Sequence, residues 1–317
     1  MAKNWMRRSV LAAACAATAL LAACGSGTVD SAIQPERFIA FGDAYSDVGQ
    51  KGSRYTINDG SINNWTQKLA DRYGKTIASV SAGGLSYAQG NARIAATPDA
   101  AGDASTLPIT AQIDLFLATH SFVSGDLVLI NGGISDLVVG MAAVQAGTKT
   151  PDEFVADARV SGKLLAAQVQ RLVDAGAPNV LVSGTYSLGV TPWAKAIDRE
   201  DLLKKASAAL NESLLVDIND LGDTVLYIDS EYFVNIYTTT PAVYGFSNRD
   251  TAICTSVDPG NGIGIGTGEV NSALCNKSTL LPGADADRYV FADKIYLTPK
   301  AQEQLGTYAY DRLRLRF

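Results

Sequence analysis

The chain has 317 residues, of which 47% are apolar and 18% are charged, and its formal net charge is −6. This apolar content is enough for the core of one large domain or of two small ones. A net acidic surface repels a phosphate backbone and the sequence has no basic stripe, so we expect no nucleic-acid partner. The chain has one histidine, which nearly excludes a histidine-based metal site, and we expect neither a metal nor a cofactor.

The first residues have the pattern of a secretion signal. Three basic residues precede a largely apolar run over residues 10–23, which is too short to span a bilayer as a helix. The run ends with Leu-Ala-Ala before Cys24, which resembles a bacterial lipobox. The resemblance implies that residues 1–23 are a lipoprotein signal peptide, that Cys24 is lipidated, and that residues 24–36 are a tether. We therefore expect a lipid-anchored protein of the bacterial cell envelope, at the periplasmic or surface face of the outer membrane. The alternative is an ordinary secreted protein cut at the same place.

Beyond residue 37, short apolar runs alternate with amphipathic helical patterns. The runs predict parallel strands buried on both faces, over residues 38–41, 127–131, 180–183 and 225–228. Helices are predicted over residues 64–73, 109–119, 151–175 and 200–221. This alternation predicts one domain over residues 37–317, an α/β fold with three layers, α/β/α, around a mostly parallel sheet.

A long stretch over residues 242–288 is rich in Gly, Ser and Asn. It contains Cys254 and Cys275, and in an oxidising periplasm two such thiols are expected to form a disulfide. The bond would close a loop of 21 positions and contribute about 3 kcal/mol by restricting the unfolded chain. The glycine-rich run 260–268 lacks the Lys-Ser/Thr pair and the strand-to-helix context of a phosphate loop, so we interpret it as a flexible surface loop.

Four short blocks resemble the signature blocks of the GDSL/SGNH hydrolase family. The first reads Gly-Asp-Ala-Tyr-Ser-Asp at residues 42–47, where the family has Gly-Asp-Ser-x-Ser-Asp with the first serine as nucleophile. The others lie at residues 86–92, 129–137 and 293–299, in the family's order. The resemblance implies an SGNH-type, flavodoxin-like fold and, for an intact member, hydrolysis of carboxylic esters as a lipase or esterase.

The resemblance also assigns a position to one or two residues in each block. Ala44 stands at the nucleophile position, Tyr296 at the position of the catalytic base, and Asp293 is the acid that precedes the base. Gly90 corresponds to the glycine whose backbone N–H enters the oxyanion hole. Ser135 replaces the asparagine whose amide points to the same place. In a parallel sheet these groups meet at the carboxyl ends of the strands.

These replacements predict that the hydrolytic machinery is lost. Ala44 has no lone pair to attack a carbonyl, and Tyr296, with an ordinary pKa of about 10, is a poor proton acceptor at neutral pH. Loss of the nucleophile or the base alone costs about a millionfold in kcat in a well-studied serine hydrolase. Our hypothesis is a pseudoenzyme in which the N–H groups of Ala44 and Gly90 and the Ser135 hydroxyl form a small nest. Such a nest could hold the carbonyl or carboxylate of an acyl ester, an acetylated glycan or a lipid product.

Two alternatives remain open. One is an active ester hydrolase with an unrecognised nucleophile, for which Ser46 is a candidate although its position in the turn aims it elsewhere. The other is an envelope scaffold that binds a protein partner. His120 at the end of a predicted helix is expected to lie on the surface or to cap that helix, and Asp43, Asp47 and Asp136 are expected to be framework residues.

Overall fold

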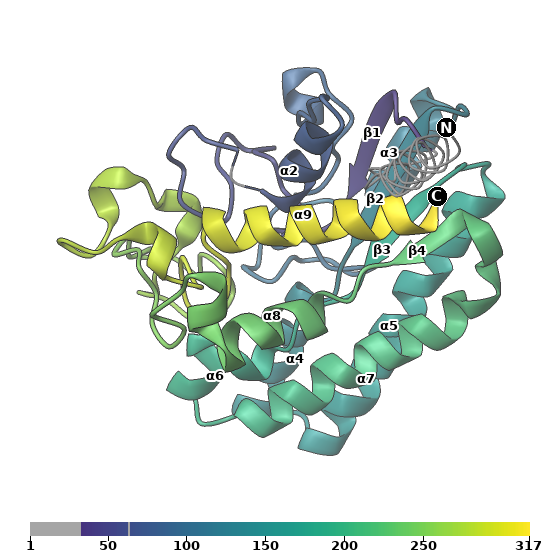
Figure 1. The fold of residues 1–317 in the computed structure, drawn as a ribbon. Coiled ribbons are helices and arrows are strands. Elements are labelled where there is room, and N and C mark those ends of the chain that lie inside the picture. The colour runs from purple at the N-terminus through teal and green to yellow at the C-terminus, as the bar shows by residue number, and fades with distance from the viewer. Residues whose placement is uncertain (1–32, 63) are drawn as a thin grey trace, which may run out of the picture.

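The computed structural model describes residues 33–62 and 64–317. Within this part of the chain, four parallel strands form one sheet in the order β1-β2-β3-β4 (Figure 1). They are β1 (Arg37–Phe41), β2 (Asp126–Asn131), β3 (Val180–Ser183) and β4 (Val225–Tyr227). The register pairs Ala40 with Leu129, and Leu129 with Leu181. The segment around Ser86 adds a short parallel bridge to the outer side of β1, at Ala40. The three-layer α/β expectation is therefore confirmed.

The helices cover both faces of this sheet (Figure 1). Their bounds are α2 (Trp65–Arg72), α3 (Ile109–Thr119), α4 (Ile134–Gln145), α5 (Pro151–Asp174), α6 (Pro192–Ala196), α7 (Glu200–Ile218), α8 (Ser230–Thr239) and α9 (Pro299–Arg316). Alternate strand residues divide between two cores: Phe38 and Leu129 pack with α2 and α9, and Ile39 and Val128 pack with α3 and α5. Because the sheet is buried on both faces, its strands are apolar except at their ends, where Arg37, Asp126, Asn131 and Ser183 lie.

Helix boundaries follow the local chemistry. Thr150 accepts the N–H of Glu153, and the Glu153 side chain accepts the Thr150 N–H, which forms a capping box at the start of α5. α4 begins directly after Gly133, whose φ of 115° favours glycine. A Cβ on Gly306 of α9 would lie 2.6 Å from the Trp65 carbonyl oxygen, so this glycine lets α9 pack closely against α2.

The segment between α8 and α9 contributes to the interior of the protein, and the run 260–268 within it is not wholly a surface loop, because Ile263 is buried. Cys254 and Cys275 form the expected disulfide, with their Cα atoms 5.9 Å apart. Both are buried in a small third core together with Ile57, Ile253 and Ala292. The glycine-rich run also contributes to the interior, because Ile263 is buried in the main core.

The expectations for the amino-terminal region fall largely outside the described residues. This holds for the signal peptide over residues 1–23, for Cys24, and for all but the end of the tether over residues 24–36. The described chain begins beside the amino end of β2, since the N–H groups of Glu36 and Arg37 donate to the Gly125 carbonyl. No described helix is long and apolar enough to cross a membrane.

Candidate functional site

The candidate site lies where β1 and β2 end, and Asp43 ties these two ends together. Its Oδ1 atom accepts the Asn131 side-chain amide (2.7 Å) and the Tyr45 N–H (3.0 Å). A Cβ at Gly42 would lie 2.1 Å from the Asn131 Oδ1 atom, so only glycine fits between the two strand ends. Complete burial raises the pKa of Asp43 to about 6. Its Oδ2 atom has no hydrogen-bond partner among the described residues.

The nucleophile position carries a buried methyl group. Ala44 is 1% exposed and belongs to the main apolar core. Next to it, the Tyr45 ring packs edge-on against Tyr186 with centroids 5.3 Å apart. Ser46 is also buried, and its hydroxyl oxygen accepts the indole N–H of Trp65 at 3.1 Å. The turn therefore places no hydroxyl at residue 44 and directs the nearest one toward Trp65.

Asp293 and Tyr296 lie next to each other, but the carboxylate contacts the Tyr296 backbone N–H. In a catalytic acid–base pair it would contact the side chain of the base. The Asp293 Oδ1 atom accepts the backbone N–H groups of Ile295 (2.7 Å) and Tyr296 (2.6 Å), and its Oδ2 atom accepts the Ser272 N–H (3.1 Å). The carboxylate thus fixes the loop through backbone groups. Burial raises the pKa of the Tyr296 phenol well above its ordinary value, and the neighbouring Asp43 charge raises it further. A neutral phenol cannot serve as a general base at neutral pH.

Aromatic side chains fill the space around Tyr296. Its ring meets Tyr55 edge-on, with centroids 5.3 Å apart, and it is itself 1% exposed. The Tyr186 hydroxyl donates to the Ile295 carbonyl at 2.7 Å and so fixes the loop that carries Tyr296. Sequence reasoning missed Tyr55 and Tyr186 because neither belongs to a signature block. Four further aromatic side chains of the chain are buried core residues: Tyr45, Trp65, Tyr87 and Trp193.

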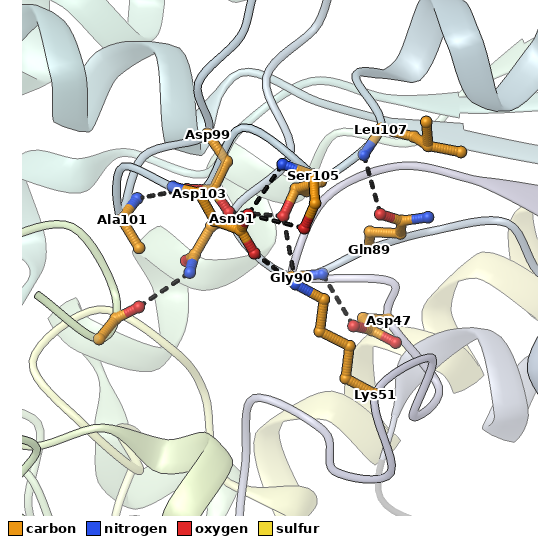
Figure 2. A network of polar contacts seen from close by, with 12 residues as sticks. Asp47, Lys51, Gln89, Gly90, Asn91, Asp99, Ala101, Asp103, Ser105 and Leu107 are labelled. Carbon is orange, nitrogen blue, oxygen red and sulfur yellow. Dashed lines mark hydrogen bonds and ion pairs between the residues drawn. The ribbon is translucent and has the colours of Figure 1, made fainter. Parts of the chain in front are cut away.

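The Gly90 N–H is already engaged, which corrects the expected nest. It donates to the Asp47 Oδ2 atom at 2.8 Å, as Figure 2 shows. The other oxygen of Asp47 accepts the N–H groups of Gly49 and Gln50, both at 2.8 Å. A Cβ at Gly90 would lie 2.1 Å from the Tyr55 ring, so the tyrosine covers this glycine closely. The Gly90 N–H is therefore not a free donor for a ligand in this structure.

The loop that follows Gly90 is held by a polar network around Asp99 (Figure 2). Asp99 Oδ1 accepts the N–H groups of Ala101 and Asp103, and Asp99 Oδ2 accepts the Thr106 hydroxyl at 2.7 Å. Lys51 pairs with Asp103 at 2.9 Å, which joins this loop to the turn that follows Asp47. These contacts connect residues 99–106 with one another and with the turn at Lys51.

Ser135 and Asp136 lie at the start of α4 and differ in their contacts. Ser135 is completely buried, and its hydroxyl has no hydrogen-bond partner among the described residues. Asp136 accepts the Ile94 N–H at 3.0 Å and pairs with the Arg93 side chain at 3.3 Å. The carboxylates of Asp43, Asp47 and Asp136 all accept backbone N–H groups. All three acids therefore have a framework role, as expected.

The histidine lies away from these residues. His120 is exposed, ends α3, and contacts the Thr119 hydroxyl at 2.8 Å. Its ring stacks on Phe116 with centroids 5.4 Å apart. α3 leads back to the amino end of β2, so His120 lies at the opposite end of the sheet from Asp43. In the described ranges no group of three or more His, Cys, Asp or Glu side chains could hold a metal ion.

Comparison with known proteins supports the resemblance seen in the blocks. The family model described as GDSL-like lipase/acylhydrolase matches residues 38–308. Two Arabidopsis thaliana proteins are similar. GDSL esterase/lipase LTL1 is 30% identical over 199 residues, which cover 58% of this chain and 50% of the relative. GDSL esterase/lipase At1g73610 is 27% identical over 155 residues, which cover 47% of this chain and 39% of the relative. A Pseudomonas putida protein, described as an uncharacterized protein in the trpE-trpG intergenic region, is 24% identical over 187 residues, covering 59% of this chain and 28% of that one. The matches thus span half or less of the length of each relative.

Proposed function

This chain belongs to the GDSL-like lipase/acylhydrolase family, and from that premise we propose that it is a catalytically degenerate member that binds an acyl-type ligand without cleaving it. The observation that carries the proposal is the buried methyl group of Ala44 at the position of the family's attacking hydroxyl. The nearest serine in the sequence does not take this place, because the Ser46 oxygen accepts the indole N–H of Trp65.

The base position supports the same conclusion. Tyr296 is locked between Tyr55 and the backbone contacts of Asp293, and its raised pKa keeps the phenol protonated at neutral pH. His120, the histidine of the chain, is exposed at the far end of the sheet. Without nucleophile and base, a serine hydrolase keeps roughly 10³–10⁴-fold over water from binding and the oxyanion hole. Here the Gly90 N–H of that hole is bound to Asp47, so we expect even this residual rate to be lost.

The proposal includes a lipid anchor at Cys24 in the bacterial outer membrane. Eight residues lie between Cys24 and Ile33, where the described chain begins, and the nine Cα-to-Cα steps of a fully extended segment span at most about 30 Å. This segment joins the domain at the amino ends of the strands, whereas Asp43, Ala44 and Asn131 lie at the carboxyl ends. A protein held this way would present its family site away from the anchoring bilayer. An acyl ester, a lipid product or an acetylated glycan in the periplasm or at the cell exterior would meet the face of the domain that carries the family's catalytic positions.

An active hydrolase is the second candidate, favoured by the esterase/lipase names of the two plant relatives. It would need an activated hydroxyl other than residue 44. Ser46 is the nearest in sequence, yet it is 1% exposed and its contact is an indole N–H, which cannot accept a proton.

Labelling with a fluorophosphonate probe separates the two candidates. Such probes react covalently with an activated serine hydroxyl, so we expect no label on the mature domain at neutral pH. The heat-denatured protein serves as the background control, and a Ser46→Ala variant identifies the residue if label appears. Stoichiometric labelling of the folded protein that is absent from Ser46→Ala would refute the degenerate site.

A further inference from the structure

Segments that are distant in sequence meet on the side of the protein where the strands begin. The described chain enters there, since the Glu36 N–H donates to the Gly125 carbonyl just before β2. The residues after α2 lie on the same side, because the Tyr73 ring packs against Phe38 of β1 with centroids 6.0 Å apart. Tyr73 also meets Tyr310 at 5.0 Å, so α9 ends on this side as well (Figure 1). We call this surface, formed by residues 72–75, 121–125 and 312–316, the amino edge.

Basic side chains gather on the amino edge although the chain as a whole is acidic. They come from the end of α2 and the end of α9, and they are Arg72, Lys75, Arg312, Arg314 and Arg316. Three of them pair with carboxylates: Lys75 with Glu36, Arg314 with Asp311, and Arg316 with Asp223. Arg72 lies over the Tyr310 ring at 4.6 Å. Arg72 and Arg312 are both exposed, and no ion pair is found for either of them among the described residues.

Exposed apolar side chains accompany these cations. Leu315 is 70% exposed in the last turn of α9, and Val123 is 50% exposed just before β2. Arg312 and Leu315 are three positions apart, so they share one face of α9. Asp217 and Asp220 at the end of α7 limit the basic surface on the side of β4. Cations beside exposed aliphatic side chains are the combination that binds an anionic bilayer surface.

We propose that the amino edge rests on a bilayer that contains anionic phospholipids, with Arg72 and Arg312 on lipid phosphates and Leu315 among the headgroups. The point of entry of the chain favours this occupant, because the residues between Cys24 and Ile33 join the domain at this edge. A basic surface adds its own affinity to that of a lipid anchor. The exposed apolar side chains favour a bilayer over a soluble polyanion, which would leave them in water.

This inference goes beyond the proposed ligand binding and does not depend on the state of residue 44. It takes from the proposed function only the anchor at Cys24, which would bring the amino edge to a membrane. An anionic bilayer attracts this edge and repels the remaining acidic surface, so the contact also orients the domain. The family's catalytic positions at the carboxyl ends of the strands then point away from the lipid.

Co-sedimentation with sucrose-loaded vesicles tests the proposal. The protein lacks its signal peptide and carries Cys24→Ser, so no acyl chain contributes to binding. Vesicles of equal parts phosphatidylglycerol and phosphatidylethanolamine should bind it, and vesicles of phosphatidylcholine alone should bind it at least about tenfold more weakly. Added salt should weaken binding to the anionic vesicles, because the attraction between exposed charges is screened.

A double variant, Arg72→Gln with Arg312→Gln, tests the two unpaired cations. It should bind the anionic vesicles about 30-fold more weakly (about 1 kcal/mol for each arginine). Arg159→Gln with Lys205→Gln is the matched control, because it removes the same charge from exposed positions in the first halves of α5 and α7. Its binding should stay within about twofold of the wild type, since those positions lie away from the amino edge.

Leu315→Ser tests the apolar contact and should weaken binding about tenfold (about 1.4 kcal/mol). Val243→Ser is its control, because Val243 is 77% exposed and lies near the other end of α9, where Gln304 donates to the Tyr244 carbonyl. The control should bind as the wild type does.

Three results would overturn the proposal: no binding to the anionic vesicles, equal binding to both kinds of vesicle, or wild-type binding by the double arginine variant. Binding of soluble polyphosphate without binding of vesicles would assign the amino edge to a free polyanion and would also overturn it. Mass spectrometry of the protein extracted from membranes tests lipidation of Cys24 separately. Failure of the anchor and failure of the amino edge are therefore distinguishable.

Discussion

Asp47 is the side chain that holds the family's oxyanion glycine in a closed arrangement, and its removal gives a quantitative test. Its carboxylate accepts three backbone N–H groups, from Gly49, Gln50 and Gly90. Burial raises the pKa of Asp47 above its ordinary value, and these three hydrogen bonds act in the opposite direction. The carboxylate therefore bears a desolvation cost that its backbone partners offset.

The magnitude follows from these bonds. A hydrogen bond to a charged group contributes about 1.5–3 kcal/mol, and the relieved desolvation of Asp47 offsets part of the total. We expect Asp47→Ala to lower the free energy of unfolding by about 4 kcal/mol, because three donors lose their acceptor. Asp47→Asn keeps one oxygen for Gly49 and Gln50 and turns an amide group toward Gly90, so we expect about 2 kcal/mol.

Urea denaturation followed by far-ultraviolet circular dichroism measures both effects. At about 2–4 °C per kcal/mol, Asp47→Ala should also lower the melting temperature by roughly 8–16 °C. Asp71→Asn is the control, because Asp71 is half exposed and pairs with Lys68 on the surface, and its removal should cost less than about 1 kcal/mol. An Asp47→Ala protein as stable as this control would refute the reasoning that Asp47 secures the Gly90 loop.

Three further predictions concern the same region. Burial raises the pKa of Asp43 to about 6 in the folded protein, above an unfolded value of about 3.9. The contribution of protonated Asp43 to the free energy of unfolding is therefore present at low pH and is lost as the pH rises between these two values. Between pH 4 and pH 7 the wild type should lose about 2 kcal/mol relative to Asp43→Asn, measured by urea denaturation at both pH values. Replacing Cys254 and Cys275 by serine should cost about 3 kcal/mol in the same assay, and the wild type with dithiothreitol should match that variant. Tyr186→Phe removes the donor to a buried carbonyl and should lower the free energy of unfolding by about 1–2 kcal/mol; an unchanged value would show that this bond does not stabilise the loop.

The sheet could be predicted from the sequence because its strands are continuous apolar runs bounded by turns. The predicted strand over residues 180–183 matches β3, and the predicted helix over residues 109–119 matches α3. α4 was missed because its apolar residues follow the buried strand β2 with only two glycines between them, so no amphipathic pattern marks the helix. α9 was not predicted because its buried side has few large apolar residues. Small residues such as Ala301 and Gly306 form much of that side.

Part of the candidate site can be predicted from short stretches of sequence, and part depends on contacts between segments that are distant in sequence. The residue types at Ala44, Asp293 and Tyr296 can be read from short sequence blocks. In the fold each block lies at a strand end or on the loop before α9. What fills the site comes from elsewhere: Tyr55 lies in an irregular segment without a motif, and the engagement of the Gly90 N–H depends on the Asp47 side chain in a separate turn. Such contacts between segments distant in sequence leave no periodic or motif signal, so they emerge only from the folded structure.

The most direct test of the degenerate site is hydrolysis of p-nitrophenyl butyrate by the mature domain, measured beside an Ala44→Ser, Tyr296→His double variant. The double variant restores the hydroxyl and the imidazole at the family's positions, next to the Asp293 carboxylate. Our account predicts no rate above the buffer blank for the wild type and a measurable rate for the double variant. Turnover by the wild type, abolished by Ser46→Ala and independent of residue 44, would contradict it.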